Sequence, residues 1–208
     1  MSDIKCGMAI SGPYAITADN LRLVSDAGIE LVEIHFAEPN FPYNDRRAVE
    51  AARGALETSG VRCRSVHLDF EPDYDISSMD PLVRTSTLDD MISALPAAKS
   101  LGAEIVVVHG SDEPVEPHER DARVRLLTDS LTALTEAAGQ VGMRIALELL
   151  PRTCLGHTTS EILDVAGRVG SDRLGSVVRN LRREYENLGG RIEFETLVED
   201  LDVQSGRV

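Results

Sequence analysis

The sequence predicts an α/β fold: a partial (β/α) TIM barrel with the first five β/α units, followed by a divergent or foreign C-terminal tail of one helix and two strands. One observation behind this prediction is a strand–helix unit that recurs along the chain. Another is that strands alternate with helices, which requires parallel pairing. A third is that polar side chains recur where the predicted strands end. We expect the incomplete barrel domain over residues 1–175 and the tail over 176–208.

The recurring unit consists of an amphipathic helix, a glycine and a short β-branched run. It is found four times, as SDAGIELVEIHF, ETSGVRCRSVHL, KSLGAEIVVVHG and GQVGMRIALELL. The glycines are Gly28, Gly60, Gly102 and Gly142, each where the C-terminal end of a helix favours a positive φ. Their spacing of 32 to 42 residues leaves room for one strand and one helix in each unit.

The first three units follow from this pattern. A strand over 4–10 precedes a helix that begins after Thr17, which Thr17 or Asp19 can cap. The second strand covers 30–36 and its helix 45–58. The third strand, 61–68, leads through a long polar loop to a helix over 81–100, in which we expect Pro96 to cause a kink or a division.

The last two units have the same form, with strands over 104–109 and 144–149 and helices over 119–138 and 160–169. A Rossmann-like sheet is the alternative α/β fold, but it needs a glycine-rich phosphate turn after the first strand. The sequence has SGPYA at that point and no GxGxxG motif anywhere. The barrel is therefore favoured.

Composition and charge restrict the compartment and the partners. The 208 residues are 42% hydrophobic, and 35 acidic residues against 21 Lys and Arg give a formal net charge of −14. Such a surface repels phosphate backbones, so no nucleic-acid partner is expected. The N-terminal MSDIKCGMAISG lacks the pattern of a secretory signal, and no apolar run is long enough to span a membrane. Three widely spaced cysteines favour free thiols, so we expect a cytoplasmic protein without a membrane partner.

Polar side chains lie at the ends of the predicted strands, where a β/α barrel has its active site. They are Glu33 and His35 in the second strand, His67 and Asp69 in the third, His109 in the fourth and Glu148 in the fifth. Period-2 alternation puts the residues of each pair on one face. If this face lines the barrel, imidazoles and carboxylates converge at one mouth, and such donors suit zinc, manganese or cobalt.

Each of these residues also has a structural interpretation. Glu148 is the strongest site candidate, because burying a carboxylate within ALELL costs on the order of several kcal/mol unless a cation or hydrogen-bond donors accompany it. His67 and His109 are either site residues or satisfied core histidines, and Glu33 is either a site residue or a buried ion-pair partner. A nucleophilic role for Cys154 is disfavoured, because no helix N-terminus or basic group accompanies it.

The run RIALELLPRTCLGHTTSEILDVAGRVGSDRLG resembles the fifth β/α unit of sugar phosphate isomerase/epimerase proteins of the xylose-isomerase-like TIM-barrel superfamily. SVHLDF and LGAEIVVVHG resemble the same group, so the resemblance covers about residues 3–175. It implies that Glu148 is a metal ligand beside the catalytic centre. It also implies a divalent metal, often manganese, that polarises a carbonyl and hydroxyl pair while carboxylates move a proton between neighbouring carbons. In the related apurinic-endonuclease branch, histidines at positions like those of His67 and His109 bind zinc.

The pattern changes after about residue 175. The family continues with a sixth strand that ends in an aspartate and a nearby histidine, whereas no histidine follows His157 in this sequence. Residues 176–208 resemble an internal segment of FAD-dependent oxidoreductases, in which a helix and LGG lead into a strand with FET. Because this segment has no dinucleotide-phosphate motif, no bound FAD is expected. A fusion, a deletion junction and a divergent sixth unit are alternative explanations.

The sequence thus predicts a metal-dependent isomerase or epimerase of a small sugar or sugar phosphate. The predicted roles are catalytic for Glu148, metal-binding for Glu148, His67 and His109, and substrate-binding for Glu33, His67 and His109. We expect a divalent metal (Mn, Co, Zn or Mg), weakly held because the later ligands of the family are absent, and little activity from this chain alone. The alternative is a non-catalytic half-barrel or interaction module, whose open sheet edges favour self-association.

Overall fold

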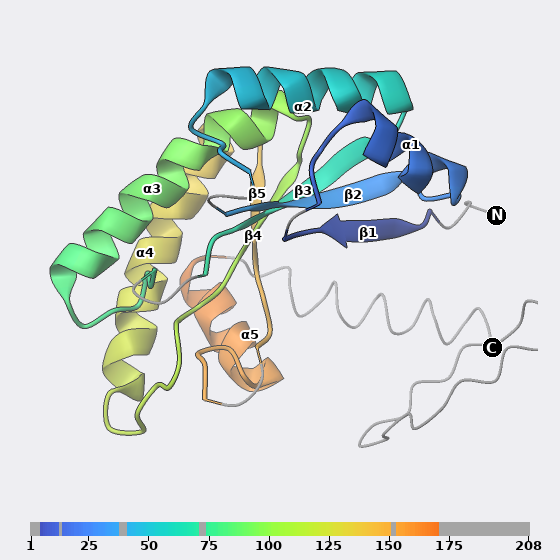
Figure 1. Ribbon diagram of the computed structural model, residues 1–208. Coiled ribbons are helices and arrows are strands. Elements are labelled where there is room, and N and C mark those ends of the chain that lie inside the picture. Colours follow the sequence, from blue (N-terminus) through green and yellow to red (C-terminus); the bar gives the residue numbers. More distant parts are fainter. Residues whose placement is uncertain (1–4, 13, 38–40, 71–73, 151–152, 171–208) are drawn as a thin grey trace, which may run out of the picture. The chain divides into compact units, whose positions relative to one another are not determined.

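The computed structural model describes residues 5–12, 14–37, 41–70, 74–150 and 153–170 (Figure 1). They belong to a unit that spans residues 1–170. The predicted helix and strands of 176–208, and the resemblance of that segment to flavoproteins, lie outside the described residues. The domain boundary near residue 175 therefore stays a prediction.

Five parallel strands form one sheet in sequence order, β1-β2-β3-β4-β5. The strands are β1 (Gly7–Ile10), β2 (Leu31–Phe36), β3 (Arg62–Leu68), β4 (Ile105–Val108) and β5 (Arg144–Leu147). Sequential order with parallel pairing is the topology of a β/α barrel, whereas a doubly wound sheet would have later strands on both sides of the first. The predicted partial barrel is confirmed.

One helix follows each strand: α1 (Ala18–Asp26), α2 (Arg46–Ser59), α3 (Pro81–Ser100), α4 (Arg120–Gln140) and α5 (Thr159–Arg168). Thr17 caps α1 as predicted, because its side chain accepts a hydrogen bond from the backbone N–H of Asn20. Of the two outcomes predicted for Pro96, the division is excluded, since α3 continues through Pro96, and the kink stays a prediction. Met91 and Ala98, on either side of this proline, are buried in the core, and this packing stabilises a continuous helix against the lost hydrogen bond.

The four repeated glycines all have a positive φ, between 70° and 87°, as predicted for the turn that leads from each helix into the next strand. This conformation is strained for any residue with a Cβ atom. The chain can therefore reverse direction at the same point in each unit.

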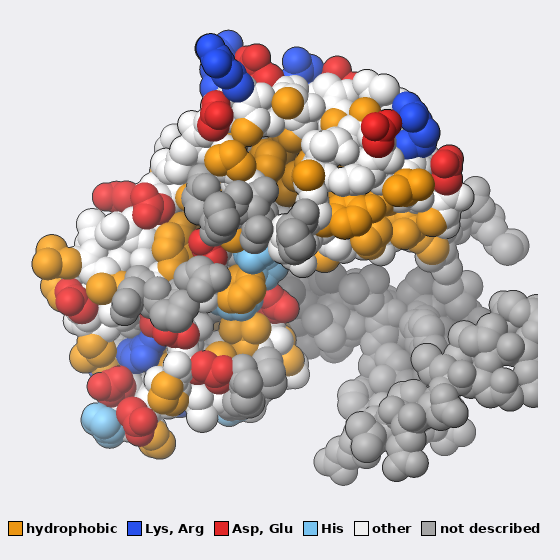
Figure 2. All heavy atoms as spheres, viewed as in Figure 1, with side chains coloured by type: hydrophobic (Ala, Val, Ile, Leu, Met, Phe, Trp, Pro, Cys, Tyr) orange, Lys and Arg blue, Asp and Glu red, His pale blue; other side chains and the backbone are white. Residues whose placement is uncertain are grey.

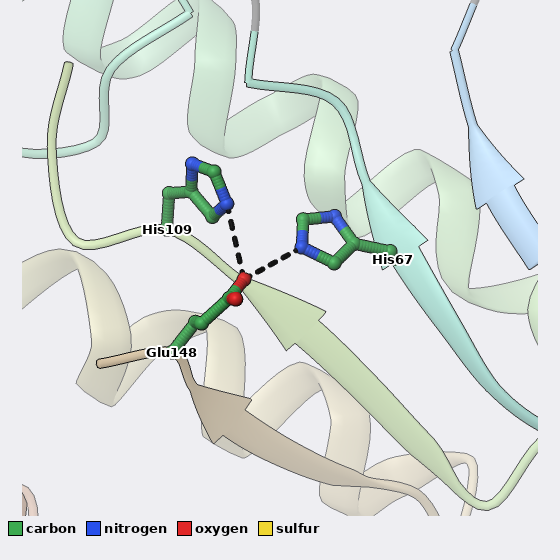
Figure 3. A group of neighbouring side chains, drawn as sticks. All are labelled: His67, His109 and Glu148. Atoms are coloured by element: carbon green, nitrogen blue, oxygen red, sulfur yellow. Dashed lines mark hydrogen bonds and ion pairs between the residues drawn. The ribbon is translucent and has the colours of Figure 1, made fainter. Parts of the chain in front are cut away.

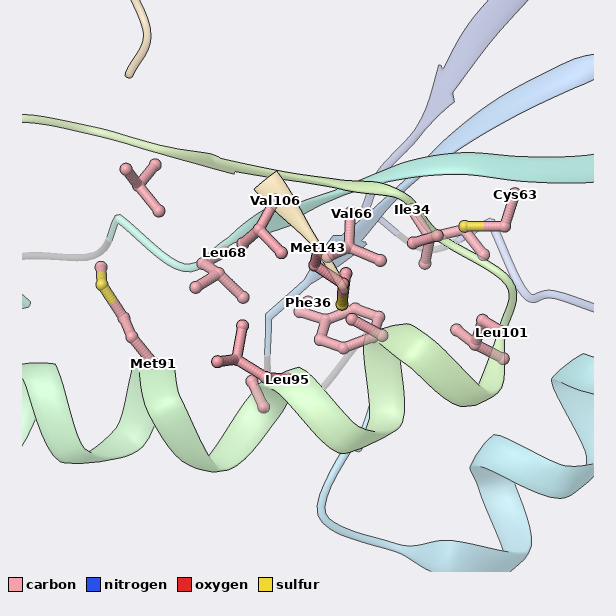
Figure 4. Packing of buried hydrophobic residues seen from close by; sticks show 14 of the residues in the cluster. Ile34, Phe36, Cys63, Val66, Leu68, Met91, Leu95, Leu101, Val106 and Met143 are labelled. Carbon is pink, nitrogen blue, oxygen red and sulfur yellow. The ribbon is translucent and has the colours of Figure 1, made fainter. Parts of the chain in front are cut away.

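The helices cover one face of the sheet, and the hydrophobic core lies between this face and the helices. On β2, every second residue is buried, whereas Leu31, Glu33 and His35 are half-buried on the opposite face. Figure 4 shows side chains of β2, β3 and β4, among them Phe36 and Val66, on the sheet side that faces α3, which carries Leu95. The face that turns away from the helices carries the polar residues that the sequence predicted.

A buried ion pair ties the loop between β3 and α3 to helix α4. Arg123 pairs with Asp75, and their side chains are only 9% and 8% exposed. The backbone N–H and the hydroxyl of Ser77 both donate to Asp75 at 2.7 Å, and Ser130 donates to the carbonyl of Ile76. These contacts satisfy the polar groups of a loop that would otherwise be buried at a cost.

None of the helices in the described part of the chain has the length and apolar character that crossing a bilayer requires.

Candidate metal centre

Three predicted site residues meet where β3, β4 and β5 end (Figure 3). His67 lies in β3, while His109 and Glu148 directly follow β4 and β5. The Nε2 atoms of His67 and His109 lie 2.9 Å and 3.1 Å from the same oxygen, Oε2 of Glu148. One ligand atom from each residue lies within 4.8 Å of the other two. Among the described residues, these side chains form a group that could hold a metal ion.

The strand register explains why residues far apart in sequence converge here. Val107 pairs with both His67 and Ala146, so β3, β4 and β5 end at the same level. The N–H of Glu148 donates to the carbonyl of Val108 at 3.0 Å and extends the pairing by one residue. Parallel strands bring their carboxyl ends to one edge of the sheet, so their last side chains become neighbours.

The proton position on His67 points to a cation or a proton between the ligand atoms. Its Nδ1 lies 2.8 Å from the carbonyl oxygen of Leu68, which can only accept a hydrogen bond. Nδ1 therefore carries the proton, and in the neutral ring Nε2 presents a lone pair to Glu148. Two such acceptors repel at 2.9 Å unless the ring is protonated or a cation joins them. Histidines that bind metals often donate their other N–H to a carbonyl in this way.

The surroundings favour a neutral His109 and an ionised Glu148. Burial lowers the pKa of His109 below its usual value of 6.5, the neighbouring His67 lowers it further, and Glu148 opposes the shift. Burial raises the pKa of Glu148, but the contacts with His67 and His109 outweigh it, so the net shift is downward. These are the protonation states that metal ligation requires.

Phe70, which the sequence analysis did not single out, lies against the histidines. Its ring stacks on those of His109, at 4.4 Å between centroids, and His35, at 5.0 Å, and meets the edge of His67 at 5.4 Å. The side chain is 43% exposed, which is unusual for phenylalanine. A phenylalanine directly after the strand-ending His67-Leu-Asp69 run was the available signal. The ring restrains the imidazoles and forms an apolar wall beside them.

Glu33 lies on the same face as the group but not in it. Its Oε2 accepts a hydrogen bond from the hydroxyl of Ser65 at 2.6 Å. In the strand register Glu33 pairs with Ser65, and His35 pairs with His67, so Glu33 lies two residues below the histidine level. That is about 6.6 Å along the strand. The predicted substrate contact of Glu33 therefore stays a prediction, and its visible role is to bridge β2 and β3.

The donor set fits a small divalent cation. Ligands about 2.0–2.2 Å from a tetrahedral metal lie roughly 3.3–3.6 Å from one another, so the contacts at 2.9 Å and 3.1 Å need to lengthen by a few tenths of an ångström. Two imidazoles and one carboxylate suit zinc, manganese or cobalt better than calcium, which takes oxygen ligands. The remaining coordination positions would be taken by water or substrate.

Comparison with known proteins gave one family and several relatives. A family model described as xylose isomerase-like TIM barrel matches residues 21–178. The L-ribulose-5-phosphate 3-epimerase UlaE of Shigella flexneri is 26% identical over 136 residues, which cover 64% of this chain and 48% of that protein. The chain thus spans about half the length of the curated relatives it matches.

Solved structures have the same fold. The D-psicose 3-epimerase of Clostridium cellulolyticum H10, solved with D-tagatose, is similar with a TM-score of 0.67 at 19% identity, covering 80% of this chain and 60% of that one. A xylose isomerase-like TIM-barrel protein from Mycobacterium smegmatis, solved in complex with magnesium, has a TM-score of 0.62 at 16% identity, with 81% and 62% covered. At such identities the similarity establishes the fold alone.

Proposed function

The chain belongs to the xylose isomerase-like TIM-barrel family, and we propose that it carries the metal-binding part of a metal-dependent sugar or sugar-phosphate isomerase or epimerase. One observation supports this proposal above the others: the imidazole nitrogens of His67 and His109 converge on one oxygen of Glu148. Imidazole and carboxylate groups that meet at the active-site end of such a sheet are typical of a metal site. The magnesium in the similar mycobacterial structure agrees with this proposal.

The proposed roles follow from the geometry. A bound divalent metal would polarise a carbonyl and the neighbouring hydroxyl of the substrate. His67 and His109 would hold the metal or contact the substrate, with the Leu68 carbonyl fixing the tautomer of His67. Glu148 would be a metal ligand through Oε2 and would act as the base that moves the proton. Its lowered pKa keeps it ionised, as ligation requires. Glu33 would be a polar contact deeper in the barrel.

The proposed substrate is a small sugar or sugar phosphate. The relatives are named for the epimerisation of L-ribulose 5-phosphate and D-psicose, which are ketoses. The acidic surface, whose Asp and Glu side chains are spread over the face in Figure 2, disfavours nucleic acid as a substrate. We propose a cytoplasmic site of action. We also propose that the metal is held weakly, because the three ligands found among the described residues are fewer than a closed site provides and the Glu148 side chain is 42% exposed.

A non-catalytic half-barrel that self-associates is the second candidate, and the first strand favours it. Gly7, Met8 and Ala9 of β1 are all exposed, and Met8 is 38% exposed. Figure 2 shows hydrophobic side chains gathered on the surface beside β1. An exposed strand edge with apolar side chains is a template for pairing with another chain. Sedimentation velocity of the wild type and of Met8→Lys would test this candidate: a concentration-dependent dimer that Met8→Lys abolishes supports it, and a monomer at all concentrations refutes it.

Metal titration tests the proposed function. The protein is titrated with Mn²⁺, Co²⁺, Zn²⁺ and Mg²⁺ in competition with a chromophoric chelator, beside Glu148→Ala and a control, His118→Ala. His118 is 78% exposed and lies outside the group, so its loss should not alter the affinity. We expect one site per chain, about a hundredfold weaker in Glu148→Ala, because one ligand in a zinc site contributes about 3 kcal/mol. Tight stoichiometric binding that Glu148→Ala leaves unchanged would refute the assignment.

A further inference from the structure

Glu148 directly follows β5, the last strand of the described sheet, and β4 is the strand beside β5 there. Its side chain is long and 42% exposed, so strand pairing alone leaves its position weakly restrained. On one side, its backbone N–H donates to the carbonyl of Val108 at 3.0 Å. A second support comes from the loop residues 153–157, which fold back against it.

Arg120, the first residue of α4, holds this loop. Its guanidinium donates to the carbonyls of Thr153, at 3.1 Å, and Cys154, at 2.8 Å. It also forms a two-pronged ion pair with Glu161 of α5, with both contacts at 2.8 Å, and contacts His157. The side chains of Arg120 and Glu161 are only 22% and 15% exposed. A bidentate, largely buried pair of this kind restrains its surroundings far more than an exposed ion pair does.

Glu161 passes this restraint on to Gly156. The N–H of Gly156 donates to Oε2 of Glu161 at 2.5 Å. Gly156 has a φ of +84°, and a Cβ atom there would lie 3.4 Å from the carbonyl oxygen of Glu148 and 3.1 Å from a methyl carbon of Ile162. The backbone at Gly156 therefore lies directly against that of Glu148, in a space that only glycine fits without adjustment.

The neighbouring strand end is tied to the same loop. The N–H of Leu155 donates to the hydroxyl of Ser111 at 2.8 Å, and both residues are buried. Ser111 follows His109 by two residues. The loop that supports Glu148 is thus also connected to the segment that carries one of the two imidazoles.

We infer that Arg120 and Glu161 are positioning residues for Glu148: their ion pair presses the loop 153–157 against the Glu148 backbone and so keeps Oε2 between the two imidazoles. This inference rests on the proposed metal centre for its functional meaning. Arg120 and Glu161 themselves lie outside that centre and act on Glu148 through the loop. Outer contacts that orient a ligand typically contribute ten- to a hundredfold to metal affinity.

Two variants test the inference. Arg120→Lys keeps the charge but loses the two-pronged geometry, and Glu161→Gln keeps the shape but loses the charge. Each is measured for Zn²⁺ affinity, for the ¹⁵N chemical shifts of the His67 and His109 rings at one fixed pH without metal, and for its melting temperature. We expect roughly tenfold weaker Zn²⁺ binding and ring shifts displaced toward those of Glu148→Ala.

Two control variants separate positioning from plain stability. Arg123→Lys, on the same helix, weakens the buried pair with Asp75 in a different loop, so it should lower the melting temperature but leave Zn²⁺ affinity and ring shifts unchanged. Arg168→Lys, on α5, alters a half-exposed pair with Asp164 and should change none of the three. The inference is overturned if Arg120→Lys and Glu161→Gln keep wild-type affinity and ring shifts, or if Arg123→Lys reproduces their effect. If wild type binds none of Mn²⁺, Co²⁺, Zn²⁺ and Mg²⁺, the proposed function fails, and the metal-free ring shifts alone decide the inference.

Discussion

Replacing Arg123 should lower the free energy of unfolding, because it breaks the buried ion pair with Asp75. In Arg123→Met, the Asp75 carboxylate stays buried, and among the described residues it keeps the two hydrogen bonds from Ser77, at 2.7 Å each, to stabilise its charge. Breaking a buried ion pair costs about 3–5 kcal/mol. Because each remaining hydrogen bond to a charged group contributes about 1.5 kcal/mol or more, we expect the lower end, about 3 kcal/mol. For a unit of this size that corresponds to a melting temperature lower by about 6–12 °C.

A double-mutant cycle gives the decisive measurement. Asp75→Asn removes the charge but keeps an oxygen that can accept from Ser77, so Arg123→Met combined with Asp75→Asn should recover about 2 kcal/mol of the loss. The free energy of unfolding is measured by urea denaturation. Arg168→Met serves as the control, since the 50% and 52% exposed pair with Asp164 should contribute less than about 1 kcal/mol. A double variant as unstable as Arg123→Met alone would show that uncompensated charge is not the cause.

Three further outcomes are expected. Phe36→Ala, which removes a fully buried ring stacked on Tyr43 at 5.2 Å, should lower the free energy of unfolding by about 3–5 kcal/mol, and a loss below about 1 kcal/mol in urea denaturation would contradict this core assignment. Gly156→Ala should lower both the melting temperature and the Zn²⁺ affinity. The control Gly170→Ala, at a φ of 87° with nothing within 4 Å of an added Cβ, should lower only the melting temperature. Equal Zn²⁺ affinities of the two variants would count against the role of the loop. Because the pKa of His109 is lower in the folded chain than in the unfolded chain, the unfolded chain takes up this proton at a higher pH. The free energy of unfolding should therefore fall as the pH drops below about 6.5. Melting curves of His109→Gln should lack this dependence on pH.

The sequence by itself determined the fold, because the information is local. Each helix end needs a residue that accepts a positive φ, and the four glycines repeat at intervals that fit one strand and one helix. The period-2 alternation of β2 sorts Glu33 and His35 onto the face away from the helices. Given parallel strands in order, the carboxyl-terminal positions of His67, His109 and Glu148 already implied one edge of the sheet. Of the kink or division expected at Pro96, the division does not occur, because core packing on both sides outweighs one lost hydrogen bond.

Only the tertiary structure decided which side chains touch. The contact between His67 and Glu148 joins residues 81 positions apart, and the strand register places both imidazoles on the same carboxylate oxygen while leaving Glu33 a level below. Phe70 and Arg120 are not marked by any periodic pattern in the sequence. The stacking of Phe70 on the histidines and the contact of Arg120 with the loop depend on the side-chain directions that result when the elements pack together. Alternation and capping fix the direction and face of each element, whereas distances between side chains of different elements depend on how those elements pack against one another.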